Sequence, residues 1–196
     1  MSLHHHFEAA LPAWVDSWVG HWLNARGMAL DSAEHRMQMA VSLSAENVRR
    51  ETGGPFGAIV VHNDTGRLVG VGVNVVTSEN LSIGHAEIIA LCLAQRSVGS
   101  WNLAEAGPMQ LVTSCEPCSM CFGAVPWSGI NSLVCGARRE DAEAAGFDEG
   151  DKPENWTASL EQRGIAVRLD LMRPEAARVL SEYADGAGAI YHPGQS

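Results

Sequence analysis

Apolar side chains recur every three or four positions along residues 7–25, which is the period of an α-helix. A second helix is expected from Asp31, because Glu34 three residues later resembles a capping box. A Gly-Gly-Pro sequence at 53–55 ends this helix. Core packing is the simplest role for the apolar faces, and a dimer surface is the alternative. Three tryptophans share one face of the first helix: Trp14, Trp18 and Trp22.

After residue 55 the pattern alternates between short runs rich in Val and Ile and longer runs with helical spacing. The residues 63–66, Asn-Asp-Thr-Gly, separate the first two short runs and predict a hairpin turn. The expected strands cover residues 56–61, 68–76, 109–113, 133–135 and 165–169. The expected helices cover residues 85–98, 118–127, 140–145, 154–162 and 174–183.

This order of elements predicts an α/β fold with three layers, α/β/α, in which helices cover both faces of a mixed five-stranded sheet. The length of 196 residues favours a single structural domain. Within it, residues 1–52 are expected to form N-terminal helices packed on a main domain of residues 53–196. No internal repeat or low-complexity linker divides the chain.

Two absences bear on the cellular compartment. No run of about 18 apolar residues occurs, so we expect no membrane-spanning helix. The first residues lack the basic and apolar pattern of a secretory signal, which favours a cytoplasmic protein. His4, His5 and His6 are set aside as a tag remnant or a frayed polar start.

Acidic residues dominate the charge of the chain. There are 23 Asp and Glu against 13 Lys and Arg, which gives a net charge of −10. A nucleic-acid binder normally gathers Lys and Arg on one face to displace counterions. Here no basic cluster exceeds a pair such as Arg49-Arg50. The charge therefore disfavours nucleic acid as a partner and favours a small neutral substrate.

Five cysteines occur, and three of them, Cys115, Cys118 and Cys121, lie within seven residues. This spacing suits a metal site better than disulfides. Cys92 and Cys135 lie in apolar segments and are expected to be buried small hydrophobes. An iron–sulfur cluster would need a fourth cysteine besides these three at an appropriate spacing, and none occurs. A closed structural zinc site would need a fourth Cys or His nearby, which is lacking unless Cys115 serves.

His85 supplies the imidazole that completes a catalytic ligand set. His85, Cys118 and Cys121 would hold one Zn²⁺ per chain at three corners of a tetrahedron and leave the fourth for water. Both ligand groups fall at expected helix starts, where unpaired amides favour thiolates. Glu87, two residues after His85, would face the open position and act as general base and then general acid.

The sequences His85-Ala86-Glu87 and Pro117-Cys118-Ser119-Met120-Cys121 together resemble the cytidine deaminase superfamily, the zinc deaminases of nucleobases. Within it, residues 53–150 are similar to bacterial guanine deaminases. Their tail is shorter, and they usually carry Asp where this chain has Glu149. The similar segments are Gly54-Pro55-Phe56-Gly57-Ala58, Gly72-Val73-Asn74, Thr113-Ser114-Cys115-Glu116-Pro117-Cys118 and Ala144-Ala145-Gly146-Phe147-Asp148-Glu149.

The resemblance implies three residues that bind the purine ring. Asn74 would hydrogen-bond the purine edge, although an Asn at a strand end is often only a turn residue. Phe56 and Trp127 would line the ring pocket, where core packing is the alternative for both. A buried amide suits a purine because it offers both a donor and an acceptor.

The resemblance also implies contacts on the amino side of the base. Glu149, with Asp148 as the second candidate, would bind the amino group and help move protons to ammonia. A solvated acidic loop is the alternative for this segment. Tyr191 would close over the site, from the same chain or from a partner. Family members commonly form dimers, so a homodimer is expected.

The favoured function is hydrolysis of a free purine base, guanine to xanthine and ammonia, with Glu87 and Glu149 as the catalytic residues. A tRNA adenosine deaminase is the first alternative, because it shares the zinc motif. A deaminase of another amino-heterocycle, such as an aminotriazine, is the second. A non-catalytic zinc module is the third, and the free carboxylate of Glu87 argues against it.

Overall fold

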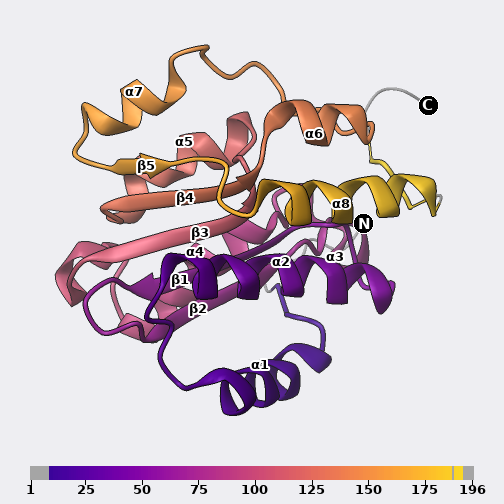
Figure 1. The fold of residues 1–196 in the computed structure, drawn as a ribbon. Helices are drawn as coiled ribbons and strands as arrows, with labels where there is room; N and C mark the ends of the chain where they lie inside the picture. Colours follow the sequence, from indigo (N-terminus) through magenta and orange to yellow (C-terminus); the bar gives the residue numbers. More distant parts are fainter. Residues whose placement is uncertain (1–8, 187, 192–196) are drawn as a thin grey trace, which may run out of the picture.

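A computed structural model describes residues 9–186 and 188–191 (Figure 1). The helices are α1 (Trp14–Arg26), α2 (Ala33–Arg49), α3 (Val76–Glu79), α4 (Ala86–Val98), α5 (Ser119–Ser128), α6 (Arg139–Ala144), α7 (Trp156–Glu161) and α8 (Arg173–Asp185), with a 3-10 helix η1 (Leu103–Ala106). The strands are β1 (Gly57–His62), β2 (Leu68–Val73), β3 (Met109–Cys115), β4 (Ser132–Ala137) and β5 (Ala166–Arg168).

The five strands form one mixed sheet in the order β2-β1-β3-β4-β5. Strand β1 pairs antiparallel with β2 and β3, while β3, β4 and β5 are parallel. Strands β2 and β3 therefore run in the same direction on either side of β1. The segments that follow these two strands leave the sheet at the same edge, which is where the site lies.

Alternate residues of β1 face two separate cores. Ala58 and Val60 pack in one core with α4 and α5, and Ile59 and Val61 pack in the other with α2 and α8. Successive side chains of a strand point to opposite faces, so the sheet separates the two cores. The three-layer α/β/α fold with a mixed five-stranded sheet is thus confirmed (Figure 1).

Two glycines of β2 let α4 approach the sheet closely. A Cβ on Gly72 would lie 2.0 Å from the carbonyl oxygen of Ala86, and one on Gly70 would lie 2.4 Å from that of Ala90. Both glycines are on the same face of the strand, since they are two residues apart. The start of α4, and with it the preceding His85, is held against the sheet by this contact.

The first helix is shorter than the periodicity predicts. It begins at Trp14, and Pro12 accounts for the late start because the residue before a proline disfavours helical geometry. Its tryptophans pack on the α2 side of the sheet, with Trp14 and Trp22 buried. Residues 1–8, including His4, His5 and His6, lie outside the described residues.

The cap of α2 and the end of β2 also differ from the predictions. Ser32 rather than Asp31 caps α2, because its hydroxyl accepts a hydrogen bond of 3.0 Å from the His35 amide. Strand β2 ends at Val73, and the unpredicted helix α3 follows. Asn74 lies at this bend, and its side-chain oxygen accepts hydrogen bonds from the Val76 amide two residues on and from the Gly54 amide before β1.

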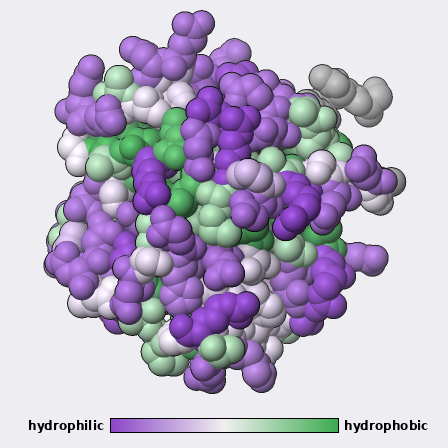
Figure 2. All heavy atoms as spheres, viewed as in Figure 1, coloured by the Kyte–Doolittle hydropathy of each residue, from purple (hydrophilic) through white to green (hydrophobic). Residues whose placement is uncertain are grey.

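Surface properties follow the composition. The face drawn in Figure 2 is mostly hydrophilic, with hydrophobic side chains visible between polar ones over β4 and β5. Cys92 is exposed, so the prediction that it is a buried hydrophobe is wrong; Cys135 is buried as predicted. None of the helices in residues 9–186 is long and apolar enough to cross a bilayer.

Replacing Gly72 by Ala should destabilise the fold by about 1–3 kcal/mol or more, because the new methyl group would press on the backbone of α4. Gly20→Ala is the matched control: no atom lies within 4 Å of its added Cβ, and Ala is the better helix former. Thermal unfolding of both variants measures the difference. A Gly72→Ala protein that melts at the wild-type temperature would contradict this packing account.

Candidate active site

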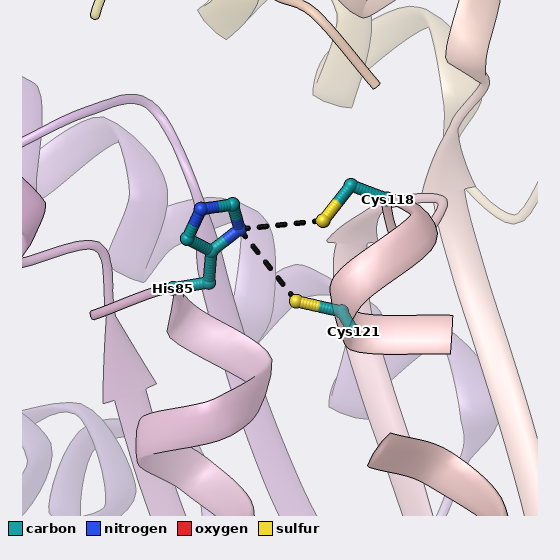
Figure 3. A group of neighbouring side chains, drawn as sticks. All are labelled: His85, Cys118 and Cys121. Atoms are coloured by element: carbon teal, nitrogen blue, oxygen red, sulfur yellow. Dashed lines mark hydrogen bonds between the residues drawn. The ribbon is translucent and has the colours of Figure 1, made fainter. Parts of the chain in front are cut away.

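The ends of two helices bring three metal-binding side chains together (Figure 3). His85 is the N-cap of α4 and Cys118 is the N-cap of α5, and neither side chain caps its own helix. His85 Nδ1 lies 3.5 Å from Cys118 Sγ and 3.6 Å from Cys121 Sγ. The candidate ligand atoms of these residues all lie within 4.8 Å of one another.

This donor set fits zinc. Two sulfurs and one imidazole nitrogen are ligands that Zn²⁺ prefers. Hydrogen bonds from Cys121 and His85 lower the pKa of Cys118 to about 4, so a thiolate is present at neutral pH. Cys115, the residue that could have completed a closed site, is outside this group, and its sulfur contacts the Arg138 carbonyl at 3.6 Å.

Glu87 lies in the first turn of α4, buried beside the three candidate ligands but not one of them. Burial raises the pKa of Glu87 to about 7, and the negative charge of Cys118 adds to the rise. A buried carboxyl group that exchanges its proton near neutral pH suits general acid and base chemistry.

Glu149 faces the same cavity from the loop after α6. It is 5% exposed, and its Oε2 atom has no hydrogen-bond partner within the described part of the chain. Burial raises the pKa of Glu149 to about 8, with a further contribution from the charge of Cys118. Buried polar atoms are normally hydrogen-bonded, so this oxygen suits a ligand that donates an N–H.

Asp148 is the less buried of the two acids on this loop. It lines the cavity at the surface, and its side chain accepts a hydrogen bond of 2.8 Å from the Gly150 amide. This contact is typical of a turn. The geometry therefore supports Glu149 over Asp148 as the group that faces a ligand.

The Asn74 side chain is buried and held in one orientation. Its Oδ1 accepts hydrogen bonds of 3.3 Å from the Gly54 and Val76 amides. Its Nδ2 donates to the hydroxyl of Tyr191 at 2.7 Å. Asn74 therefore lies behind Tyr191 rather than among the residues that line the cavity, and its amide nitrogen contacts the cavity only through the Tyr191 hydroxyl.

Tyr191 of the same chain covers the cavity. Its ring contacts His85 and Phe147 edge to face, at centroid distances of 6.2 and 6.0 Å. The free volume beneath it is about 30 Å³, which is room for about one water molecule. A purine can enter only if the Tyr191 segment moves.

Of the two predicted ring-pocket residues, the structure places only Phe56 at the cavity. Phe56 lines it and packs edge to face on Phe147 at 4.8 Å. Trp127 is 79% exposed and lies outside the residues that line the cavity, so the structure does not bring it to the site within this chain. Six residues of helix separate Trp127 from Cys121, which turns its side chain to a different face of α5.

Two residues at the cavity were not assigned a role from the sequence, Phe147 and Glu116. Both are buried. Each lies in a segment that resembles guanine deaminases, and position within those segments was the only available signal. Neither has a residue type or spacing that would identify it alone.

Three comparisons with known proteins agree with this geometry. Solved structures of the guanine deaminase from Nitrosomonas europaea and of a mutant in complex with 8-azaguanine are similar to the chain. The first has 42% identity, a TM-score of 0.85, and coverage of 94% of this chain and 100% of the other. The second has 41% identity, a TM-score of 0.86, and coverage of 95% and 100%.

Two sequence relatives support the same family, although their similarity covers a smaller share of this chain. The guanine deaminase of Bacillus subtilis (strain 168) is 38% identical over 123 residues, which are 60% of this chain and 76% of the relative. The tRNA-specific adenosine deaminase of Buchnera aphidicola is 35% identical over 129 residues, 66% of this chain and 79% of the relative.

A family match includes the residues of the candidate metal site. The description "Cytidine and deoxycytidylate deaminase zinc-binding region" matches residues 30–137, a range that includes His85, Glu87, Cys118 and Cys121. The five-stranded sheet, the His/Cys/Cys group and the similarity to bacterial guanine deaminases lead to one conclusion. The chain belongs to the cytidine and deoxycytidylate deaminase family of zinc-dependent aminohydrolases.

Proposed function

We propose that this protein hydrolyses a free purine base, guanine, to xanthine and ammonia. One observation carries the proposal: Glu149 lines the cavity together with Glu87 and Cys118, and its buried Oε2 has no hydrogen-bond partner among the described residues. A carboxylate there can accept an N–H from the amino group that is removed. The similarity to guanine deaminases and to a protein crystallised with 8-azaguanine supports the same substrate class.

The polar groups of the cavity complement guanine. Once Tyr191 moves, the Asn74 Nδ2 that donates to its hydroxyl can pair with the 6-oxo group of guanine. Adenine carries an amino donor at that ring position and would leave Asn74 unpaired. Glu149 presents an acceptor for the 2-amino group. Phe56 and Phe147 supply aromatic surface for the ring.

The residues of the chain account for the proton transfers. Zinc held by His85, Cys118 and Cys121 would act as a Lewis acid that activates water. Glu87 takes one proton from the water that attacks C2 and delivers it to ring nitrogen N3. Glu87 then passes the second proton of that water to the departing amine, while Glu149 orients the amino group. The water oxygen becomes the 2-oxo group of xanthine, and ammonia leaves.

Adenosine deamination on tRNA is the second candidate, because the Buchnera tRNA deaminase is also similar to this chain. Two features of the site weigh against it. The rim carries Asp148 next to Glu149, where an RNA phosphate would be repelled. Tyr191 of the same chain must also move before either ligand can enter, and a flipped nucleotide needs additional room for its sugar and phosphate.

Glu87→Gln should reduce turnover by at least about 10²-fold, the lower end for an acid–base residue, and leave the zinc content unchanged. Glu161→Gln, an exposed substitution on α7, is the control and should behave as wild type. Steady-state ammonia release and metal analysis measure both quantities. Wild-type turnover by Glu87→Gln would remove Glu87 from the mechanism.

Cys118→Ala should lose most of its zinc, because two protein ligands bind the ion far more weakly than three. Cys92→Ala is the matched control, since Cys92 is exposed and lies outside the ligand group. Metal content after gel filtration tests this directly. A fully metallated Cys118→Ala protein would show that the ligand set is assigned incorrectly.

Guanine should have the highest kcat/KM in a panel with adenine, cytosine, cytidine, an aminotriazine and a tRNA anticodon stem-loop. The other substrates should be at least about fivefold poorer, because an unpaired buried donor or acceptor costs about 1–3 kcal/mol. Ammonia release from zinc-loaded protein provides the measurement. Faster deamination of the stem-loop than of every free base would overturn the proposal in favour of the tRNA activity.

A further inference from the structure

Lys152 is buried near the candidate active site although it contacts neither the metal ligands nor the cavity. Its side chain is 2% exposed, and Nζ lies 3.1 Å from Glu116 Oε2. It also donates to the Pro117 carbonyl at 3.0 Å and lies 4.2 Å from the centre of the Trp156 ring. Burying an ammonium group is costly unless it is paired, so these contacts must form together.

The partners of Lys152 belong to the turn that carries a metal ligand. Glu116 and Pro117 directly precede Cys118, and Glu116 also lines the cavity. Lys152 itself follows Glu149 by three residues, on the loop after α6. The ion pair therefore joins the loop of Glu149 to the Cys118 turn.

A second attachment joins the same two segments on the other side of Cys118. The backbone oxygen of Glu149 accepts hydrogen bonds from the Ser119 amide at 3.0 Å and from the Ser119 hydroxyl at 3.2 Å. Gly150 allows the close approach, because a Cβ at this position would lie 3.0 Å from the Ser119 hydroxyl oxygen. The loop is thus held at two points that flank the ligand.

One oxygen of the Glu149 side chain is not held by a hydrogen bond. This atom, Oε2, is buried without a hydrogen-bond partner in the described residues. Its position therefore depends on packing and on how the loop that carries Glu149 is attached. Of these two attachments, the one made by Lys152 depends on a charged side chain, and the one made by Ser119 does not.

We propose that Lys152 is a positioning residue that holds the Glu149 carboxyl group over the cavity by tying its loop to Glu116 and Pro117. The functional part of this inference rests on the proposed role of Glu149 with substrate. The attachment of the loop to the Cys118 turn does not depend on that role. Hydrogen exchange tests the attachment, and kinetics tests its effect on Glu149.

The mechanical test is amide hydrogen exchange on the zinc-loaded full chain with Lys152→Met, which removes the charge but keeps an apolar chain over Trp156. We expect at least about tenfold faster exchange in residues 146–152 and at the Ser119 amide, with slow exchange retained in β1 and β3. Arg168→Met, which breaks an exposed ion pair with Glu34, is the control and should leave the exchange rates of both the loop and the strands unchanged. Unchanged exchange in the loop of Lys152→Met would overturn the proposal.

The functional test is a double-mutant cycle with Glu149→Gln, measured as kcat/KM on the base that the wild-type protein deaminates fastest. Lys152→Met alone should lower kcat/KM at least about tenfold with full zinc content, and it should change the Glu149→Gln protein less than twofold. Equal losses in both backgrounds would overturn the positioning role. A silent Glu149→Gln would instead refute the proposed function of Glu149, while the exchange result would still decide on the attachment.

A second variant covers the case in which Lys152→Met fails to fold because Glu116 is left unpaired. Glu116→Gln combined with Lys152→Met removes both charges, so no uncompensated ion stays buried. This protein should recover the melting temperature but keep the fast loop exchange. Recovery of slow exchange together with stability would contradict a positioning role for the ion pair.

Discussion

The close approach of α4 to β2 is the contact on which the candidate active site depends. Gly70 and Gly72 leave room for the backbone of the helix, which holds its first turn against the sheet. Strands β2 and β3 run in the same direction, so α4 and α5 begin at the same edge. His85 and Cys118, which are 33 residues apart, consequently meet there at 3.5 Å.

Two buried carboxyl groups lie at the same cavity, although burial and mutual repulsion both disfavour their charged forms. Glu87 and Glu149 both face the cavity, and burial raises the pKa of each. Lys152, buried beside Glu116, brings positive charge close to this group, and zinc held by His85, Cys118 and Cys121 would add more. The two proposed catalytic acids are thereby buried at one small cavity, where the proposed substrate would supply the hydrogen bond that Glu149 lacks in the described structure.

Residue type and spacing were sufficient to predict the ligand group, since a helix start after each strand places His85 and Cys118 correctly. The alternation of apolar runs was likewise sufficient for the order of strands and helices. The predictions that the structure does not support share one cause. The direction in which a side chain points depends on packing against other elements, which the sequence of one segment does not specify. Trp127 and Cys92 lie on outward faces of their helices, and Tyr191 reaches Asn74 from 117 positions away.

The most direct test of the account is a crystal structure of the zinc-loaded protein with 8-azaguanine, using anomalous data above the zinc edge. The account predicts one zinc ion bound by His85 Nδ1 and the sulfurs of Cys118 and Cys121. It also predicts a purine ring whose amino group contacts Glu149 and whose oxo group accepts from Asn74. Zinc bound through Cys115, or a purine that contacts neither Glu149 nor Asn74, would contradict it.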